Sequence, residues 1–531
     1  MLTHAPFSDT SKKNGTSSLQ IHPVDPKIRT TNTMNSRYLA SCLLVGLLLS
    51  PHAIAKKNRG LTALQLLSIR SVRGATISAN GEHVAFTVSK ARGDDEKTGA
   101  AHKAVWVLRY GAGQARRFTP ENGSVSGIGF TPDSKRLTFL TKRGKDAKHQ
   151  LWWMALDGGE AEALTDAKEG VSDYEFSPDG SQLAYLTSAP QSKERAAAEK
   201  KGFDEVVVHK NPRHHQLRVR NIHSKQEWLI SPADKTVFEF SWSPNGKEML
   251  IMQGDSPRSD DNLMFRSLWR IPVDNNPKTT GTRLAHKMGK MVQPGWSPKG
   301  TRIAWRGASV KNDATNGTIW YLPAKGGTPR AMNSGALETV YDMDWLTEDE
   351  LLVTAVKGTQ TELSRRNLNG TSHVIKSAGA TFLSVDIDKA GKKIVFIGST
   401  GTEPHDLYTG ELNGVIGRTL EHNPQLKGVQ WAKQETVEWK AQDGEGIQGV
   451  MIYPIGHRKK TRYPLVMMVH GGPEWQALDG WISRYLWPGQ VLAAKGYAVD
   501  GELAVQAAVL RLPWQIIKTW AGKNSGITSL R

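Results

Sequence analysis

The chain has 531 residues, which predicts more than one domain. Hydrophobic residues make up 38% and charged residues 23%, which excludes a disordered chain and is typical of a soluble globular protein. The formal charge of +18 favours contact with anionic surfaces. The basic residues are scattered and accompany no nucleic-acid-binding motif, so we expect a solvated basic surface and no nucleic-acid partner.

An export signal is predicted near the amino terminus. Residues 39–49, LASCLLVGLLL, follow Arg37 and precede the small-residue site Ala53-Ile54-Ala55. We therefore predict a signal peptide at residues 34–55, starting at Met34 and cleaved after Ala55. The apolar run is too short to span a bilayer, so we expect periplasmic or secreted protein without a stable membrane anchor. Residues 1–33 are predicted to be a non-native or disordered extension.

Cysteine usage agrees with export. The only cysteine, Cys42, lies inside the predicted signal peptide. The mature chain would therefore have no disulfide framework, no cysteine-based zinc site and no cysteine nucleophile. We predict no metal site and no other cofactor.

One sequence pattern recurs seven times in the middle of the chain. Pro presets the backbone of a turn, Asp, Asn or Lys follows, Gly takes a positive φ, and a short strand comes next. The copies are ISANGEHVAFTVS (77–89), FTPDSKRLTFLT (130–141), FSPDGSQLAYLT (176–187), WSPNGKEMLIM (242–252), WSPKGTRIAWRG (296–307), WLTEDELLVTA (345–355) and IDKAGKKIVFIGS (387–399).

The spacing of these copies predicts a seven-bladed β-propeller over residues 56–428. A period of roughly 40–65 residues is typical of propeller blades. A second hairpin with an Asp-Gly-Gly or Lys-Gly-Gly turn follows several copies. The aromatic residue before the turn is expected to pack between blades. A β-sandwich with chance similarity is the alternative.

Two insertions interrupt the repeat. Residues 191–211 contain the polar run SKERAAAEKKG, which predicts a helix or a mobile loop. Residues 255–262, DSPRSDDN, form an acidic segment that is either a solvated loop or a site for a substrate amine or calcium. Glu205 and Asp260 are candidates for binding the amino terminus of a substrate.

The pattern changes after residue 428. Residues 436–454 predict a hairpin, and YPLVMMVHGGP, from Tyr463, predicts a buried parallel strand that ends in His470, Gly471, Gly472 and Pro473. A strand that stops in a Gly pair leaves backbone amides bare, and such amides can hold a developing oxyanion. A helix at 491–496 and a strand at 497–499 follow. This order of elements, β, β, β, α, β, is the start of an α/β sheet.

The combination of WKAQDGEGIQGVMIYP, YPLVMMVHGGP and VLAAKGYAV resembles the prolyl oligopeptidase family of serine peptidases, on its dipeptidyl-peptidase and acylaminoacyl-peptidase side. The resemblance covers residues 61–499. It implies a mainly β fold, with a β-propeller followed by an α/β-hydrolase domain that starts at 429–499. It also implies hydrolysis of short peptides, with His470, Gly471, Gly472 and Pro473 as the loop of the oxyanion region.

The catalytic residues of that family have no positions in this sequence. The family needs a G-x-S-x-G nucleophile elbow followed by Asp and His, and the sequence contains no G-x-S-x-G. We therefore expect an incomplete α/β-hydrolase domain, inactive as written. The alternative function is a catalytically dead propeller that binds peptides or a protein partner in the cell envelope. The choice among dipeptidyl, acylaminoacyl and internal cleavage stays open.

Residues 500–531 are predicted to be an aberrant tail from a shifted reading frame or a decayed gene. A divergent helix broken at Pro513 is the alternative. Because further strands of the sheet are missing, residues 466–469 and 498–499 are expected to lack partners.

Overall fold

The structure is a computed structural model that describes residues 60–505, apart from 145–146, 204, 206–211, 277–279, 287–288, 310–316, 333–337, 377–378, 442–443, 445 and 469–475. All these residues belong to one unit, Asn58–Arg531. The predicted signal peptide, the 1–33 extension and residues 506–531 of the predicted tail lie outside the described residues. Within the described part of the chain, no helix is long and apolar enough to cross a membrane.

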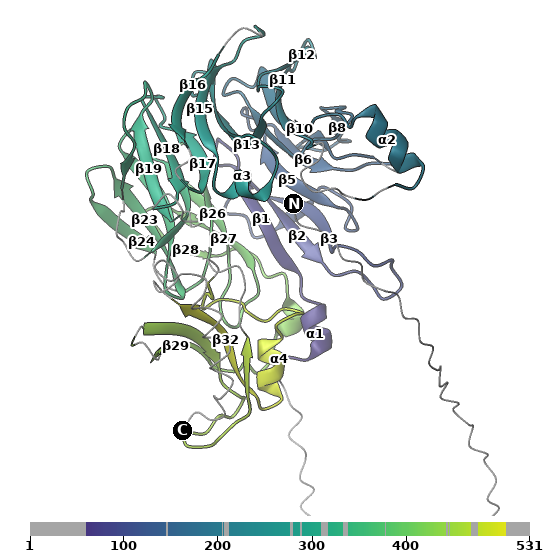
Figure 1. The fold of residues 1–531 in the computed structure, drawn as a ribbon. Coiled ribbons are helices and arrows are strands. Elements are labelled where there is room, and N and C mark those ends of the chain that lie inside the picture. Colours follow the sequence, from purple (N-terminus) through teal and green to yellow (C-terminus); the bar gives the residue numbers. More distant parts are fainter. Residues whose placement is uncertain are drawn as a thin grey trace, which may run out of the picture. The chain divides into compact units, whose positions relative to one another are not determined.

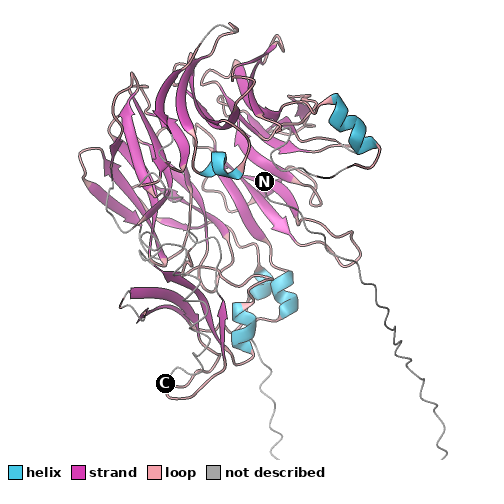
Figure 2. Cartoon of the chain, in the orientation of Figure 1, coloured by secondary structure: helices cyan, strands magenta, loops and turns pink. Residues whose placement is uncertain are grey.

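Strands dominate the fold (Figure 2). Seven four-stranded antiparallel sheets follow one another, and each is made of four consecutive strands (Figure 1). The first three contain β1 (Ser71–Ile77), β2 (His83–Lys90), β3 (His102–Arg109) and β4 (Ala115–Arg117); β5 (Val125–Phe130), β6 (Arg136–Thr141), β7 (Gln150–Ala155) and β8 (Glu162–Ala163); and β9 (Asp173–Phe176), β10 (Gln182–Ser188), β11 (His215–Asn221) and β12 (Glu227–Leu229).

The other four sheets have the same strand order. They contain β13 (Thr236–Trp242), β14 (Glu248–Gly254), β15 (Ser267–Pro272) and β16 (Thr282–His286); β17 (Met291–Trp296), β18 (Arg302–Gly307), β19 (Thr318–Pro323) and β20 (Arg330–Ala331); β21 (Thr339–Trp345), β22 (Glu350–Lys357), β23 (Gln360–Asn367) and β24 (Ser372–Lys376); and β25 (Val385–Ile387), β26 (Lys393–Gly398), β27 (Asp406–Glu411) and β28 (Ile416–Arg418).

Each predicted copy of the repeat forms the turn between the first and second strands of one sheet. In the fourth sheet, the Ser243 hydroxyl donates to Asn245 Oδ1 at 2.8 Å and accepts from the Glu248 amide at 2.9 Å. The backbone of Gly246 has a φ of +69°. The repeated residues therefore build a turn in which the Gly position needs a left-handed backbone conformation.

Replacing Gly246 by Ala is expected to destabilise the chain by about 1 kcal/mol, since an L side chain is strained in the left-handed region. An added Cβ would meet only Pro178 at 3.7 Å, so the cost comes from the backbone and not from a clash. Gly417→Ala is the control, because Gly417 has neither a positive φ nor any neighbour within 4 Å of an added Cβ. Equal urea midpoints for the two variants would contradict this prediction.

The aromatic residues before the turns pack between consecutive sheets, as predicted. The Trp242 indole donates to the Glu175 carbonyl of β9 at 3.1 Å, and the Trp345 indole donates to the Gly295 carbonyl of β17 at 3.3 Å. The first and last sheets also touch, because β1 packs against β25 and β26. Val72 and Phe86 share one buried cluster with Val395 and Leu407.

An eighth sheet with the order β29-β30-β32-β31 follows the seven antiparallel sheets. Its elements are β29 (Gln434–Lys440), β30 (Gly446–Ile452), β31 (Leu465–Met468), α4 (Gly489–Ala494) and β32 (Ala498–Val505). The predicted order of elements and the antiparallel hairpin of β29 and β30 are confirmed. The remaining short helices are α1 (Ala63–Leu67), α2 (Lys193–Lys200), α3 (Ser259–Leu263) and η1 (Pro424–Leu426).

The expectation that residues 466–469 and 498–499 lack partners is wrong for 466–468 and 498–499, while residue 469 lies outside the described residues. Val499 pairs with Ile452 of β30 on one side and with Val466 of β31 on the other. The crossover through α4 returns the chain between these two strands, which are not neighbours in the sheet. The strand also continues through Val505, so the predicted domain boundary at residue 499 falls inside β32. Within the described residues, the outer edge of β31 has no strand partner.

Candidate functional site

The carboxyl end of β31 is the candidate site. β31 and β32 run parallel and are joined through α4, and ligands of α/β sheets bind beyond the carboxyl ends of such strands. Met468, the last residue of β31, is buried in a cluster with Ile452, Ala493 and Val499. The predicted oxyanion loop, His470, Gly471, Gly472 and Pro473, starts just beyond this end but lies outside the described residues.

The segment after this loop is attached to the antiparallel sheets. The Asp479 amide donates to the Thr359 carbonyl at 2.8 Å, and the Asp479 carboxylate accepts from Gln434 Nε2 at 2.8 Å. The Trp481 amide donates to Ser399 Oγ at 3.1 Å. These hydrogen bonds of Asp479 and Trp481 therefore hold the α/β sheet against the β22–β23 and β26–β27 connections.

These two connections belong to a class that we call the 2–3 loops, meaning the connections between the second and third strands of each sheet. In a four-stranded meander, the 2–3 loop and the link to the next sheet lie at the same end. The links are short, so the 2–3 loops of consecutive sheets gather on one side of the seven sheets. The α/β sheet contacts that side.

Both predicted insertions lie in 2–3 loops. The 191–211 insertion contains α2, which the polar run predicted as one of two possibilities, and the 255–262 segment contains α3. Glu205 is exposed, with its carboxylate 3.7 Å from the Arg195 guanidinium. Among the residues that the structure describes, no group of three His, Cys, Asp or Glu side chains could hold a metal ion.

A row of carboxylates on the first strands was not predicted from the sequence. Its members lie on β9, β13, β21 and β25, and each accepts a backbone N–H from the first strand of another sheet. Glu175 accepts from Trp242 N at 3.3 Å, and Glu239 accepts from Gln293 N. Asp342 accepts from Val385 N at 3.0 Å, and Asp386 accepts from Ile77 N at 2.9 Å. An acid inside an aromatic or apolar strand just before a repeat turn, as in DYEFS and FEFSW, was the available signal.

Burial raises the pKa of Glu175, Asp342 and Asp386 in this row, and of Asp344 next to it. It raises the pKa of Glu175 to about 8, and the nearby Asp173 charge acts in the same direction. Burial also raises the pKa of Asp386, with the Asp342 charge adding to the effect. The pKa of Asp344 lies well above its usual range because of burial and the Asp342 and Asp386 charges. In the folded chain, Glu175, Asp344 and Asp386 therefore favour the protonated form.

The Glu175 carboxyl predicts a loss of stability as the pH rises from about 4.5 to about 8. Its pKa in the folded state is about 8, above the ordinary value of 4.5 in the unfolded chain, so folding favours the protonated form. The stabilisation is fully present below about pH 4.5 and falls by roughly 1 kcal/mol per pH unit up to about pH 8. Glu175→Gln should flatten this part of the curve of unfolding free energy against pH. Parallel curves for the variant and the parent would contradict the assignment.

Comparison with known proteins identifies the fold and its relatives. No protein-family model matches the chain. Dipeptidyl-peptidase 5 of Arthroderma otae is 26% identical over 279 residues, a match that covers 49% of this chain and 38% of that protein. The acylaminoacyl peptidase of Pyrococcus horikoshii gives a TM-score of 0.63 at 15% identity, covering 82% of this chain and 66% of that one.

A puromycin-hydrolyzing peptidase of Mycobacterium tuberculosis is similar to the same extent, with a TM-score of 0.62 at 13% identity over 83% of this chain and 67% of that one. The match to the curated relative spans under half of that protein's length. Antiparallel meander sheets followed by an α/β sheet define a β-propeller and hydrolase architecture. In sequence and in architecture, the chain is therefore similar to serine peptidases of the prolyl oligopeptidase family.

Proposed function

We propose that the chain belongs to an exported serine peptidase that hydrolyses short peptides, and that it supplies the peptide-recognising part. The observation that carries this proposal is the attachment of the parallel β31–β32 pair to the 2–3 loops, through Asp479 and Trp481. This attachment holds the segment that follows β31 against the seven sheets. The relatives named dipeptidyl-peptidase and acylaminoacyl peptidase support the same substrate class.

In this proposal the seven sheets are the blades of a closed propeller. The contact of β1 with β25 and β26 supports closure, as does the bond from Ile77 of the first sheet to Asp386 of the last. Such a ring over the α/β sheet would admit short peptides and exclude folded proteins.

Hydrolysis in this family needs groups that this sequence does not contain. A serine attacks the carbonyl, a histidine takes its proton, and backbone amides hold the oxyanion. Only the last of these has a candidate here, the His470 to Pro473 loop, and the sequence has no G-x-S-x-G. The 531 residues by themselves would therefore bind peptides without cleaving them. A propeller that serves only for binding, in the cell envelope, is the second candidate, and the missing motif favours it.

Two measurements on the purified chain test this function. Calorimetric titration with di- to hexapeptides is expected to show saturable binding, and the peptides should be recovered intact. A fluorophosphonate probe should leave the chain unlabelled. Absence of binding to any peptide would contradict peptide recognition. Labelling would reveal a nucleophilic serine and contradict the proposed lack of cleavage.

Export makes a separate prediction. Expression of the full sequence in a Gram-negative host should yield mature protein in the periplasm that begins at Lys56. The small residues Ala53 and Ala55 occupy the third and first positions before the cleavage site. Intact-mass measurement of the periplasmic and cytosolic fractions checks this. Protein that retains Met34 in the cytosol would contradict it.

A further inference from the structure

A cavity of about 220 Å³ lies between the second and third sheets. It is smaller than the pockets that enclose drug-sized ligands, which suits one terminal group or side chain. Its walls come from the 2–3 loop of the second sheet, the link between the two sheets, and the ends of β9 and β10. The lining residues are Lys142, Lys148, His149, Glu169, Gly170, Val171, Ser172, Thr187 and Ser188.

The cavity lies on the side of the sheets that the α/β sheet contacts. Lys142 and Lys148 belong to the β6–β7 connection, which is a 2–3 loop like the β22–β23 connection that bonds to Asp479. Thr187 and Ser188 end β10, next to the 2–3 loop that carries α2. A peptide held near the α/β sheet could therefore extend toward this cavity.

The charge of the cavity is positive. Its single acidic lining residue, Glu169, is paired with Arg213 at 2.5 Å. Burial and the Lys142 charge lower the pKa of His149, which leaves that ring neutral at pH 7. Within the described part of the chain, no carboxylate forms an ion pair with Lys142 or Lys148. Two ammonium groups therefore line the cavity without an anionic partner among the described residues.

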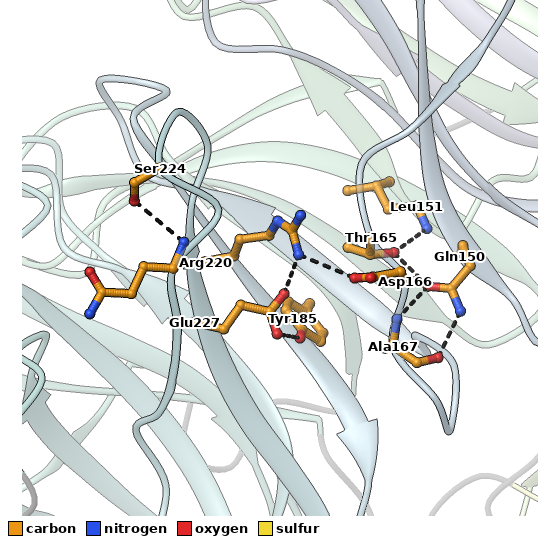
Figure 3. A network of polar contacts seen from close by, with 10 residues as sticks. Gln150, Leu151, Thr165, Asp166, Ala167, Tyr185, Arg220, Ser224 and Glu227 are labelled. Atoms are coloured by element: carbon orange, nitrogen blue, oxygen red, sulfur yellow. Dashed lines mark hydrogen bonds and ion pairs between the residues drawn. The ribbon is translucent and has the colours of Figure 1, made fainter.

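The link between the two sheets, which contributes residues 169–172 to the lining, is held by hydrogen bonds and an ion pair. Figure 3 shows the Gln150 side chain between the two sheets, where it donates to the Ala167 carbonyl at 2.8 Å and accepts from the Ala167 amide at 3.0 Å. Arg220 reaches Asp166 of the same link at 3.3 Å. Two further bonds hold this link, from the Thr187 hydroxyl to the Gly170 carbonyl at 2.7 Å and from Val171 N to the His149 carbonyl at 2.8 Å.

We propose that this cavity binds a carboxylate of a peptide substrate, with Lys142 and Lys148 as the cationic partners. The proposal rests on the peptide-binding function above and adds a substrate class to it, namely peptides with a free carboxylate beyond the bond to be cleaved. A carboxyl terminus and an Asp or Glu side chain both supply such a carboxylate. Both sources offer the same chemistry to the two ammonium groups.

Binding of three fluorescent pentapeptides to the full chain tests this assignment. The first has a free carboxyl terminus, the second is its amide, and the third is the amide with one internal Asp. The free acid, the Asp peptide or both should bind at least fivefold more tightly than the plain amide, and which of them does so identifies the carboxylate. The advantage should shrink in 0.5 M NaCl, because salt screens exposed charges.

Lys142→Gln with Lys148→Gln should abolish this advantage and leave the affinity for the amide unchanged. Lys325→Gln with Lys427→Gln is the control, since both lysines are exposed and lie outside the cavity. The proposal would be overturned, while peptide binding stands, if the parent bound all three peptides with equal affinity. It would also be overturned if the double variant lost as much affinity for the amide as for the peptides with a carboxylate.

Titration with N-acetylglycine, followed by chemical shifts, separates the two proposals. If no pentapeptide binds but N-acetylglycine binds the parent and not the double variant, the cavity assignment stands and the peptide function fails. If neither binds, both proposals fail.

Discussion

Replacing Asp386 by Ala should destabilise the chain by about 2–3 kcal/mol, because it leaves buried polar groups without partners at the contact between the first and last sheets. The Asp386 carboxylate accepts from the Thr76 hydroxyl at 2.6 Å and from the Ile77 amide at 2.9 Å. No strand is shared between these sheets, since each is made of four consecutive strands. The Asp386 side chain supplies polar contacts here, together with the backbone bonds from Val72 N to the His405 carbonyl at 3.0 Å and from Lys389 N to the Ala79 carbonyl at 3.1 Å.

Asp386→Asn is the matched variant. Its amide oxygen can accept the same two hydrogen bonds, and it removes a negative charge that lies near Asp342 and Asp344. We expect its unfolding free energy to stay within about 1 kcal/mol of the parent at pH 7. Urea denaturation measures both variants. Equal losses for Ala and Asn would show that the acceptor atoms do not matter, and a negligible loss for Ala would contradict a role of Asp386 in closing the sheets.

Replacing Asp500 by Asn should stabilise the α/β sheet by on the order of 2–3 kcal/mol at pH 8. Asp500 lies within β32, is buried, and has one carboxylate oxygen without a hydrogen-bond partner in the described structure. Burial raises its pKa to about 6 from an ordinary 3.8. The folded state therefore binds a proton more tightly than the unfolded chain.

The sign of the pH effect follows from that shift. The stabilisation from the protonated carboxyl is complete below about pH 4 and is lost as the pH rises through 6. Amide hydrogen exchange in β30 and β32 should therefore quicken in the parent between pH 4 and 7, after correction for intrinsic rates, and not in Asp500→Asn. Asp349→Asn is the control, because the Asp349 side chain is exposed and its loss should change nothing in β30 or β32. Asp479→Asn would not serve, because the Asp479 carboxylate accepts a hydrogen bond from Gln434. Identical exchange in the parent and Asp500→Asn would contradict this account.

The repeated turns could be predicted from sequence because their chemistry is local. Ser243, Asn245 and Gly246 lie within four residues and determine the turn through their own side chains and φ preference. The α/β elements could be predicted for a similar reason, since apolar runs and Gly496, with a φ of +92°, mark where a strand or helix ends.

The polar bonds between sheets could not be predicted in the same way. Asp386 and Ile77 are separated by most of the chain, so nothing local to either residue shows that they meet. The partners of Val499 were missed because the pairing of β32 depends on the crossover through α4. Its neighbours Ile452 and Val466 are adjacent to it only in the folded sheet.

We propose that these residues come from a prolyl oligopeptidase-family peptidase whose catalytic serine is not among them. The nucleotide sequence of the gene from codon 490 onward, translated in all three frames, tests it most directly. We predict that one of the three frames encodes G-x-S-x-G followed by Asp and His, because the resemblance calls for that motif and residues 500–531 do not contain it. If no frame encodes it, the serine-peptidase proposal is contradicted, and peptide binding by the propeller becomes the function to test.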